Sequence, residues 1–150
     1  MRVAPMSSRF LEACRRRPTD VRPVWFMRQA GRYLKQYREI RSKHGILEIC
    51  KRPDLAAAVT LQPVEILDVD AAIIFADLLL PVEVMGLKLR FAPGEGPVIG
   101  NPVRTSADVD SLSISNTDDL GYVGEAIQLV TKALAAKVPV VGFVGAPFTV

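Results

Sequence analysis

Near the middle of the chain the sequence reads Asp70-Ala71-Ala72-Ile73-Ile74-Phe75-Ala76-Asp77. Six apolar residues thus stand between two aspartates. The run is continuously apolar and does not alternate with polar residues, which is typical of a parallel strand covered on both faces. Similar runs occur at residues 24–27 and 139–145. These three runs predict three buried strands of one parallel sheet.

Helical patterns occupy the segments between and around these strands. Apolar residues recur on one face of predicted helices at residues 7–17, 33–43, 54–67 and about 117–137. Gly45 is a plausible end for the second helix. Pro63 is expected to kink or end the third helix, and Asn116 or Thr117 can cap the fourth.

A separate excursion interrupts the alternation of strands and helices. Alternating polarity at residues 87–91 and 97–99, around a Pro-Gly turn, predicts a β-hairpin. The rest of the order is strand, helix, strand, helix, strand, which indicates an α/β fold with a parallel sheet. A (β/α)8 barrel takes about 250 residues. Three strands in 150 residues therefore correspond to about the first half of such a barrel.

Composition narrows the class of protein. Hydrophobic residues make up 49% and charged residues 23% of the chain, values typical of a globular domain and not of a disordered one. No apolar run approaches the ~18 residues of a membrane span, and the arginine-bearing N-terminus has no secretory signal pattern. Cys14 and Cys50 lack a Cys-x-x-Cys spacing, so a reducing cytoplasm is the simpler interpretation.

Charge is distributed unevenly along the chain. Residues 1–52 hold 14 Lys and Arg against 4 Asp and Glu, whereas residues 53–150 hold 5 against 12. A basic segment of this kind is compatible with nucleic acid, a membrane surface or a polyanionic small molecule. A solvated basic helix face is the alternative for any single arginine.

The first candidate site follows the first predicted strand and reads Arg28-Gln29-Ala30-Gly31-Arg32. Loops at the carboxyl ends of parallel strands usually host the site in such folds. Arginine forks bind carboxylates and phosphates bidentately, and Gly31 allows a close approach of the backbone to a ligand. Arg28 and Arg32 could instead pair with nearby acids.

The second candidate is Asp77, a carboxylate directly after a buried strand. It is either a functional group at the strand end or a cap for the following turn. A third candidate, the small-residue turn at 145–149, is better explained as a barrel-rim turn. His44 is the only histidine, so a Ser-His-Asp triad or a multi-histidine metal site within this sequence is improbable.

Several of these segments together resemble a known family. The segment Pro23-x-Trp25-x-Met27-Arg28-Gln29-Ala30-Gly31-Arg32-Tyr33 resembles the first signature of the uroporphyrinogen decarboxylase family. Further family-like segments follow in the expected order: Leu61-Gln62-Pro63, residues 70–77, Gly94-x-Gly96-Pro97, Gly121-Tyr122-Val123 and residues 142–149. The resemblance covers residues 18–150.

The resemblance implies a (β/α)8 TIM barrel, with residues 1–150 as the N-terminal portion of its single domain. It implies a cytoplasmic homodimer in porphyrin and haem biosynthesis. Members of the family remove four acetate carboxyl groups from uroporphyrinogen III and give coproporphyrinogen III. They use no metal and no organic cofactor, and neither nucleic acid nor a membrane is an implied partner.

The resemblance also assigns roles to residues. Arg28, Gln29, Ala30, Gly31 and Arg32 would bind substrate carboxylates, with Arg28 also near the reacting ring. Asp77 would face the pyrrole N–H groups, and Arg41 would add to the basic surface. A tyrosine, a serine and a histidine of the family site are expected beyond residue 150. Two alternatives remain: a corrinoid-linked methyltransferase on the same barrel, and an inactive tetrapyrrole-binding protein.

Overall fold

A computed structural model describes residues 8–26, 33–92, 96–113, 117–146 and 148. The described elements are α1 (Arg9–Cys14), α2 (Lys35–Arg41), α3 (Ile46–Lys51), α4 (Pro53–Leu67), β1 (Ala72–Ile73), α5 (Leu80–Val84), β2 (Leu89–Ala92), β3 (Gly96–Ile99), α6 (Ser106–Asp110), the 3-10 turn η1 (Thr117–Leu120), α7 (Gly121–Leu134) and β4 (Val140–Val141). Along the chain, helices come first, and the β2–β3 hairpin then lies in sequence between the parallel strands β1 and β4.

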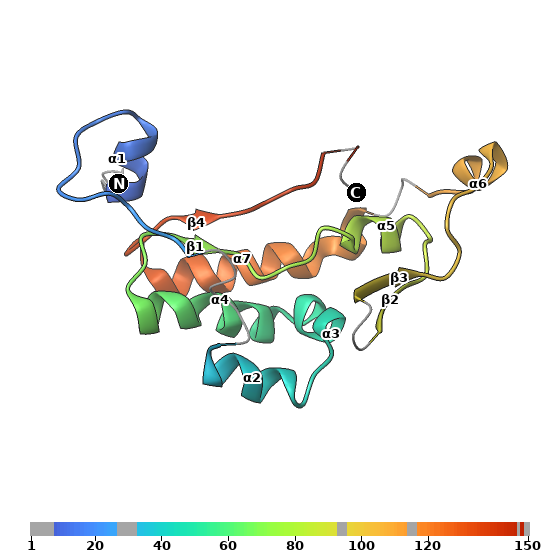
Figure 1. Ribbon diagram of the computed structural model, residues 1–150, viewed down its shortest axis with the longest axis horizontal. Helices are drawn as coiled ribbons and strands as arrows, with labels where there is room; N and C mark the ends of the chain where they lie inside the picture. The colour runs from blue at the N-terminus through green and yellow to red at the C-terminus, as the bar shows by residue number, and fades with distance from the viewer. Residues whose placement is uncertain (1–7, 27–32, 93–95, 114–116, 147, 149–150) are drawn as a thin grey trace.

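Strands β1 and β4 form the parallel pair that the apolar runs predict. Ala72 lies opposite Val140 and Ile73 opposite Val141. The N–H group of Ala72 donates to the carbonyl of Pro139 over 2.9 Å, and that of Ile74 donates to Val141 over 3.0 Å. Helices α4 and α7 lie together along one side of this pair (Figure 1). Both predicted strands are thus confirmed, although the paired segments are shorter than the apolar runs.

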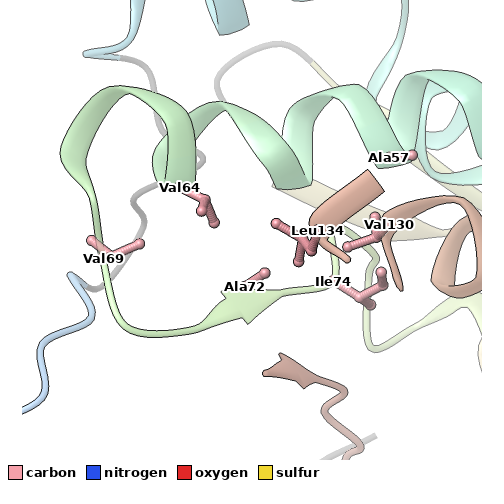
Figure 2. Packing of buried hydrophobic residues seen from close by; sticks show 7 residues of the cluster. All are labelled: Ala57, Val64, Val69, Ala72, Ile74, Val130 and Leu134. Atoms are coloured by element: carbon pink, nitrogen blue, oxygen red, sulfur yellow. The ribbon is translucent and has the colours of Figure 1, made fainter. Parts of the chain in front are cut away.

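The main core fills the space between β1, α4 and α7. Its members are buried aliphatic side chains from all three elements and from the residues that flank β1: Ala57, Val64, Val69, Ala72, Ile74, Val130 and Leu134. Figure 2 shows the side chains of the two helices pointing toward those of β1. Val130 is fully buried, because α7 places its apolar positions on the face that meets α4.

A second core lies between α2, α3 and the other side of α4. It consists of the buried residues Leu34, Tyr37, Ile49 and Val59. The ring of Tyr37 also contacts the ring of Phe75, with centroids 5.8 Å apart. Helix α4 therefore carries buried residues toward two separate cores, which matches its high content of small and aliphatic residues.

Pro63 lies inside α4 and does not end it. The helix continues to Leu67 and ends where Asp68 adopts a left-handed conformation with φ 50°. The helix predicted at residues 54–67 is therefore confirmed, and of the two effects expected of Pro63, an end of the helix is not observed. Packing of α4 against the two cores stabilises the helix across the hydrogen bond that proline cannot donate.

Strands β2 and β3 form the predicted antiparallel hairpin, with Leu89 opposite Ile99. The short helix α5 precedes it and ends before Gly86, whose φ of 105° favours glycine. A capping box starts α6, because the side chain of Thr105 accepts from the N–H group of Asp108 and the Asp108 carboxylate accepts from the N–H group of Thr105.

The sequence-based strand at 24–27 is not observed in its described part. Residues Val24 and Phe26 have no strand assignment and expose 48% and 51% of their surface. Val24 pairs with the chain before β1, because its carbonyl accepts from the N–H group of Asp70. In residues 24–26, the described part of this segment, the chain thus lacks the strand assignment and the full burial that the sequence predicts.

The helices also differ in detail from the predicted ranges. The expected helices at 7–17 and 33–43 appear as the shorter α1 and α2. Gly45 follows α2 as expected, but it also begins α3, which the sequence patterns did not reveal. The helix expected at 117–137 starts as η1 and ends at Leu134, where Ala135 turns left-handed with φ 45°. Among the described residues, no helix is long and apolar enough to cross a membrane.

Candidate functional site

Asp77 follows the carboxyl end of β1, at the place where α/β folds keep functional groups. The strand ends at Ile73, and the chain turns into α5 at Leu80. Asp77 is partly exposed. The structure therefore places this carboxylate just after the predicted strand, with part of its surface exposed.

One carboxylate oxygen of Asp77 is used by the protein itself. Its Oδ1 atom accepts a hydrogen bond from the N–H group of Leu79 over 2.9 Å. Within the described part of the chain, no donor reaches Oδ2. The turn thus fixes the direction of the carboxylate and leaves one oxygen for a donor that comes from outside this segment.

Thr60 of α4 holds the chain just before Asp77. Its hydroxyl group accepts from the N–H group of Phe75 over 2.8 Å and donates to the carbonyl of Ala56 over 2.7 Å. Thr60 is buried, with 1% of its surface exposed. The sequence analysis missed this residue, because a threonine inside a helix carries no signal for a partner on a distant strand.

Cys50 of α3 lies within the electrostatic reach of Asp77. Burial raises the pKa of the Cys50 thiol to about 12, and the charge of Asp77 adds to the shift, while Arg41 and Lys51 oppose it. The thiol is therefore protonated at neutral pH and is not a nucleophile. Both described cysteines are free, Cys14 exposed and Cys50 buried.

An ion pair and a tyrosine lie beside this thiol. Lys51 of α3 donates to Glu83 of α5 over 2.7 Å. Burial first, and then the charges of Glu83 and Cys50, raise the pKa of Tyr122 on α7. The pair joins α3 to α5 and so supports the turn that contains Asp77.

The structure describes Arg41 but not the arginine motif at residues 28–32. Arg41 is exposed at the end of α2, and its guanidinium donates to the carbonyl of His44. It therefore binds the loop between α2 and α3, and no described contact joins it to Asp77. Arg28, Gln29, Ala30, Gly31 and Arg32 lie outside the described residues. The substrate-binding role assigned to all of these residues stays a prediction.

A charged network fixes the chain that leads to the arginine motif. The guanidinium of Arg9 binds both oxygens of Asp20 over 2.7 and 2.8 Å and donates to Oδ1 of Asp70 over 2.7 Å. Oδ2 of Asp70 accepts from the N–H group of Val24 over 2.7 Å. These bonds raise the pKa of Arg9 and lower that of Asp20. The network joins α1 to the start of β1, a link across 61 residues that no local pattern reveals.

The described residues contain no group of three His, Cys, Asp or Glu side chains that could hold a metal ion. In the third candidate, the turn at 145–149, residues 147 and 149 lie outside the described residues, whereas Phe148 is fully exposed.

A family model described as uroporphyrinogen decarboxylase (URO-D) matches residues 6–150. The chain belongs to the uroporphyrinogen decarboxylase family. Relatives with that name include proteins from Solibacter usitatus, 85% identical over 99% of this chain and 43% of the relative, and from Koribacter versatilis, 56% identical over 98% and 42%. A relative from Sorangium cellulosum is 59% identical over 96% of this chain and 41% of its own. The chain thus spans about two fifths of the length of these relatives.

Comparison with solved structures supports the same fold. A methyltransferase from Methanosarcina mazei superimposes with a TM-score of 0.71 over 93% of this chain and 42% of its own, at 21% sequence identity. Similarity at this level of identity shows the fold alone. Family membership and the parallel β1–β4 pair, with α4 and α7 on one side, confirm a (β/α)8 barrel fold of which this chain carries a part.

Proposed function

We propose that the full-length protein with this sequence is a uroporphyrinogen decarboxylase. It removes the four acetate carboxyl groups of uroporphyrinogen III and releases coproporphyrinogen III and carbon dioxide. The match of the family model over residues 6–150 carries this proposal. The name shared by relatives that are 56–85% identical supports it.

The position of Asp77 after β1 supports a role for it in this chemistry. Loss of carbon dioxide leaves an electron pair on the acetate carbon, and a protonated pyrrole ring can accept that pair. We assign Asp77 to the pyrrole N–H groups, where its negative charge stabilises the ring as it becomes cationic. The unshared Oδ2 atom and the partial exposure of Asp77 support the assignment.

Arginines are proposed to hold the polyanionic substrate. Arg28 and Arg32 would bind its carboxylates bidentately, with Gln29, Ala30 and Gly31 between them. Arg28 would also orient the reacting ring, because a guanidinium has too high a pKa to act as a ready acid. Arg41 would contribute only to the positive potential around the site, as its guanidinium already binds a carbonyl.

Further features of the whole protein belong to the same proposal. It would act as a cytoplasmic homodimer, and its substrate would be its only small-molecule partner. The protonated pyrrole ring supplies the electron sink that a cofactor supplies elsewhere, so the reaction would need neither a metal nor an organic cofactor. A tyrosine, a serine and a histidine from the remaining part of the barrel would complete the site.

The methyltransferase alternative has weaker support. The solved methyltransferase is similar in fold but only 21% identical, whereas relatives named as decarboxylases are far more similar. A His-x-Cys pair with a later cysteine in the remaining sequence would favour the methyltransferase.

A full-length chimera tests the proposal. In it, this sequence replaces the matching part of the Solibacter usitatus relative, which supplies the rest of the barrel. Anaerobic incubation with uroporphyrinogen III should give coproporphyrinogen III and four equivalents of carbon dioxide. Substrate binding without carbon dioxide release would instead indicate a non-catalytic tetrapyrrole-binding protein.

A further inference from the structure

Thr60 has an environment unlike that of the other buried residues. Among the described residues, Thr60 is the one classed as both polar and buried, and 1% of its surface is exposed. It lies on α4 beside Ala56, Ala57, Val59 and Val64, all of them apolar and buried. A hydroxyl group in such surroundings is costly unless both its donor and its acceptor are used.

The hydroxyl group of Thr60 makes one hydrogen bond as a donor and one as an acceptor, and only the first stays within α4. The bond to the carbonyl of Ala56 is the usual bond of a threonine within its own helix. The bond from the N–H group of Phe75 joins α4 to the chain beyond β1. That second bond is the reason why a valine of the same shape would not be equivalent at this position.

The Phe75 N–H group has no partner in the sheet itself. The N–H groups of Ala72 and Ile74 donate to Pro139 and Val141. Successive N–H groups along a strand point to opposite sides, so the N–H group of Phe75 points away from β4. Thr60 thus provides the acceptor for the first N–H group after the β1–β4 ladder ends.

Two bonds then fix the short segment that carries Asp77. Before Asp77, the N–H group of Phe75 is held by Thr60 at 2.8 Å. After it, the N–H group of Leu79 is held by Oδ1 of Asp77 at 2.9 Å. The ring contact between Phe75 and Tyr37 adds a third restraint on the same segment.

We infer that Thr60 is a positioning residue for Asp77: its buried hydroxyl group fixes the backbone at Phe75, and thereby the place of the Asp77 carboxylate relative to β1. This inference rests on the proposed function. Small displacements of a catalytic group lower kcat strongly, whereas substrate binding through distant groups changes little. Thr60 should therefore affect kcat far more than KM.

Three variants of the full-length chimera test the inference. Thr60→Val keeps the shape and removes the hydroxyl group, and it should lower kcat about 10- to 100-fold with KM changed less than about twofold. Thr60→Ser should retain most of the activity. Thr60→Ala and Thr60→Ser differ only in the hydroxyl group, so this pair decides the question if the valine variant does not fold. Wild-type kcat in Thr60→Ala or Thr60→Val, or a serine variant as slow as the alanine variant, would overturn the inference.

A double variant separates positioning of Asp77 from a general structural role. If Thr60 acts through Asp77, adding Thr60→Val to Asp77→Asn should lower kcat less than about twofold further. A further loss as large as that of the single Thr60→Val variant would overturn the inference and leave the proposed function intact. A chimera that forms no product would refute the proposed function and the inference with it. An Asp77→Asn variant with wild-type kcat would overturn the inference and leave the proposed function intact.

Discussion

The start of β1 is held by charged groups that water can reach, whereas its far end is held by a hydroxyl group that water cannot reach. At the start, Asp70 binds Arg9 and the N–H group of Val24. At the end, Thr60 binds the N–H group of Phe75. The Asp70 side chain is 12% exposed and that of Arg9 is 34% exposed, against 1% for Thr60.

Because of this difference, the two ends of β1 should respond differently to salt, to pH and to substitutions. Charged hydrogen bonds near water respond to salt and pH, but they adapt when a side chain shifts. A buried neutral hydroxyl does not respond to salt or to pH, and its close-packed surroundings permit almost no change in shape. The charged end binds Val24, which precedes the predicted substrate-binding arginines. The neutral end binds Phe75, which precedes the predicted catalytic carboxylate.

The largest effect is expected for Asp77→Asn in the full-length chimera. The change keeps the shape and removes the charge, so kcat should fall about 100- to 1,000-fold while KM stays similar. Asp68→Asn is the matched control, because Asp68 is 89% exposed and asparagine tolerates its left-handed backbone. Equal kcat values for the two variants would remove Asp77 from the mechanism.

Thr60→Val should destabilise the protein by about 2 kcal/mol, since it leaves the buried N–H group of Phe75 without an acceptor. Urea denaturation measures the change. The loss should be the same in 0.05 M and 1 M sodium chloride, and Thr60→Ser should recover more than half of it. A loss that depended on salt would contradict the description of this end as neutral.

Asp70→Asn should destabilise the protein by about 1.5 kcal/mol at low salt, because a charge-assisted bond becomes a neutral one. The same denaturation experiment in 1 M sodium chloride should give a smaller loss, as salt screens the partly exposed pair. If the loss were the same at both salt concentrations, the two ends of β1 would not differ in the way described above.

Acid should loosen the charged end first. The hydrogen bond from Arg9 lowers the pKa of Asp20, and the bond from Arg15 lowers that of Glu12. A carboxylate with a lowered pKa stabilises the fold fully above its unfolded pKa of about 4 and loses this contribution as the pH falls toward its folded value. As the pH falls below about 4, amide exchange corrected for its intrinsic rate should increase in residues 9–24 before it increases at Phe75. Earlier exchange at Phe75 would contradict this order.

The smallest effect is expected for an exposed pair far from either end. Lys35 and Glu39 lie 3.8 Å apart on α2, with side chains 80% and 60% exposed. Glu39→Ala should change stability by less than about 0.5 kcal/mol. A change as large as that of Asp70→Asn would mean that exposure does not rank these interactions.

Features that depend on residues close together in the sequence were predicted, whereas features that depend on distant residues were not. The β1 strand and the hairpin were predicted because burial and turn chemistry are visible in neighbouring residues. The strand at 24–27 was predicted from the same signal, yet Val24 and Phe26 have no strand assignment and are about half exposed. A strand needs partners, and an apolar run does not say which partners are within reach.

In the candidate site, too, the residue with a local sequence signal was predicted and those with distant partners were missed. Asp77 was found because the end of an apolar run marks the end of a strand, and its loop hydrogen bond to Leu79 was the alternative considered. Thr60 and Arg9 were missed, because their partners lie 15 and 61 residues away. The family resemblance supplied the arginine motif, whereas charge and spacing alone left its role open.

The two cysteines of this chain differ enough to make one of them a chemical handle. Cys50 is buried in α3, and burial raises its pKa to about 12. Alkylating reagents that need an accessible thiolate should therefore not react with it. Cys14 is exposed at the end of α1. A maleimide dye should therefore attach to this chain at one position. That position lies on the helix that also carries Arg9, so the dye would report the movements of α1 without any engineered residue.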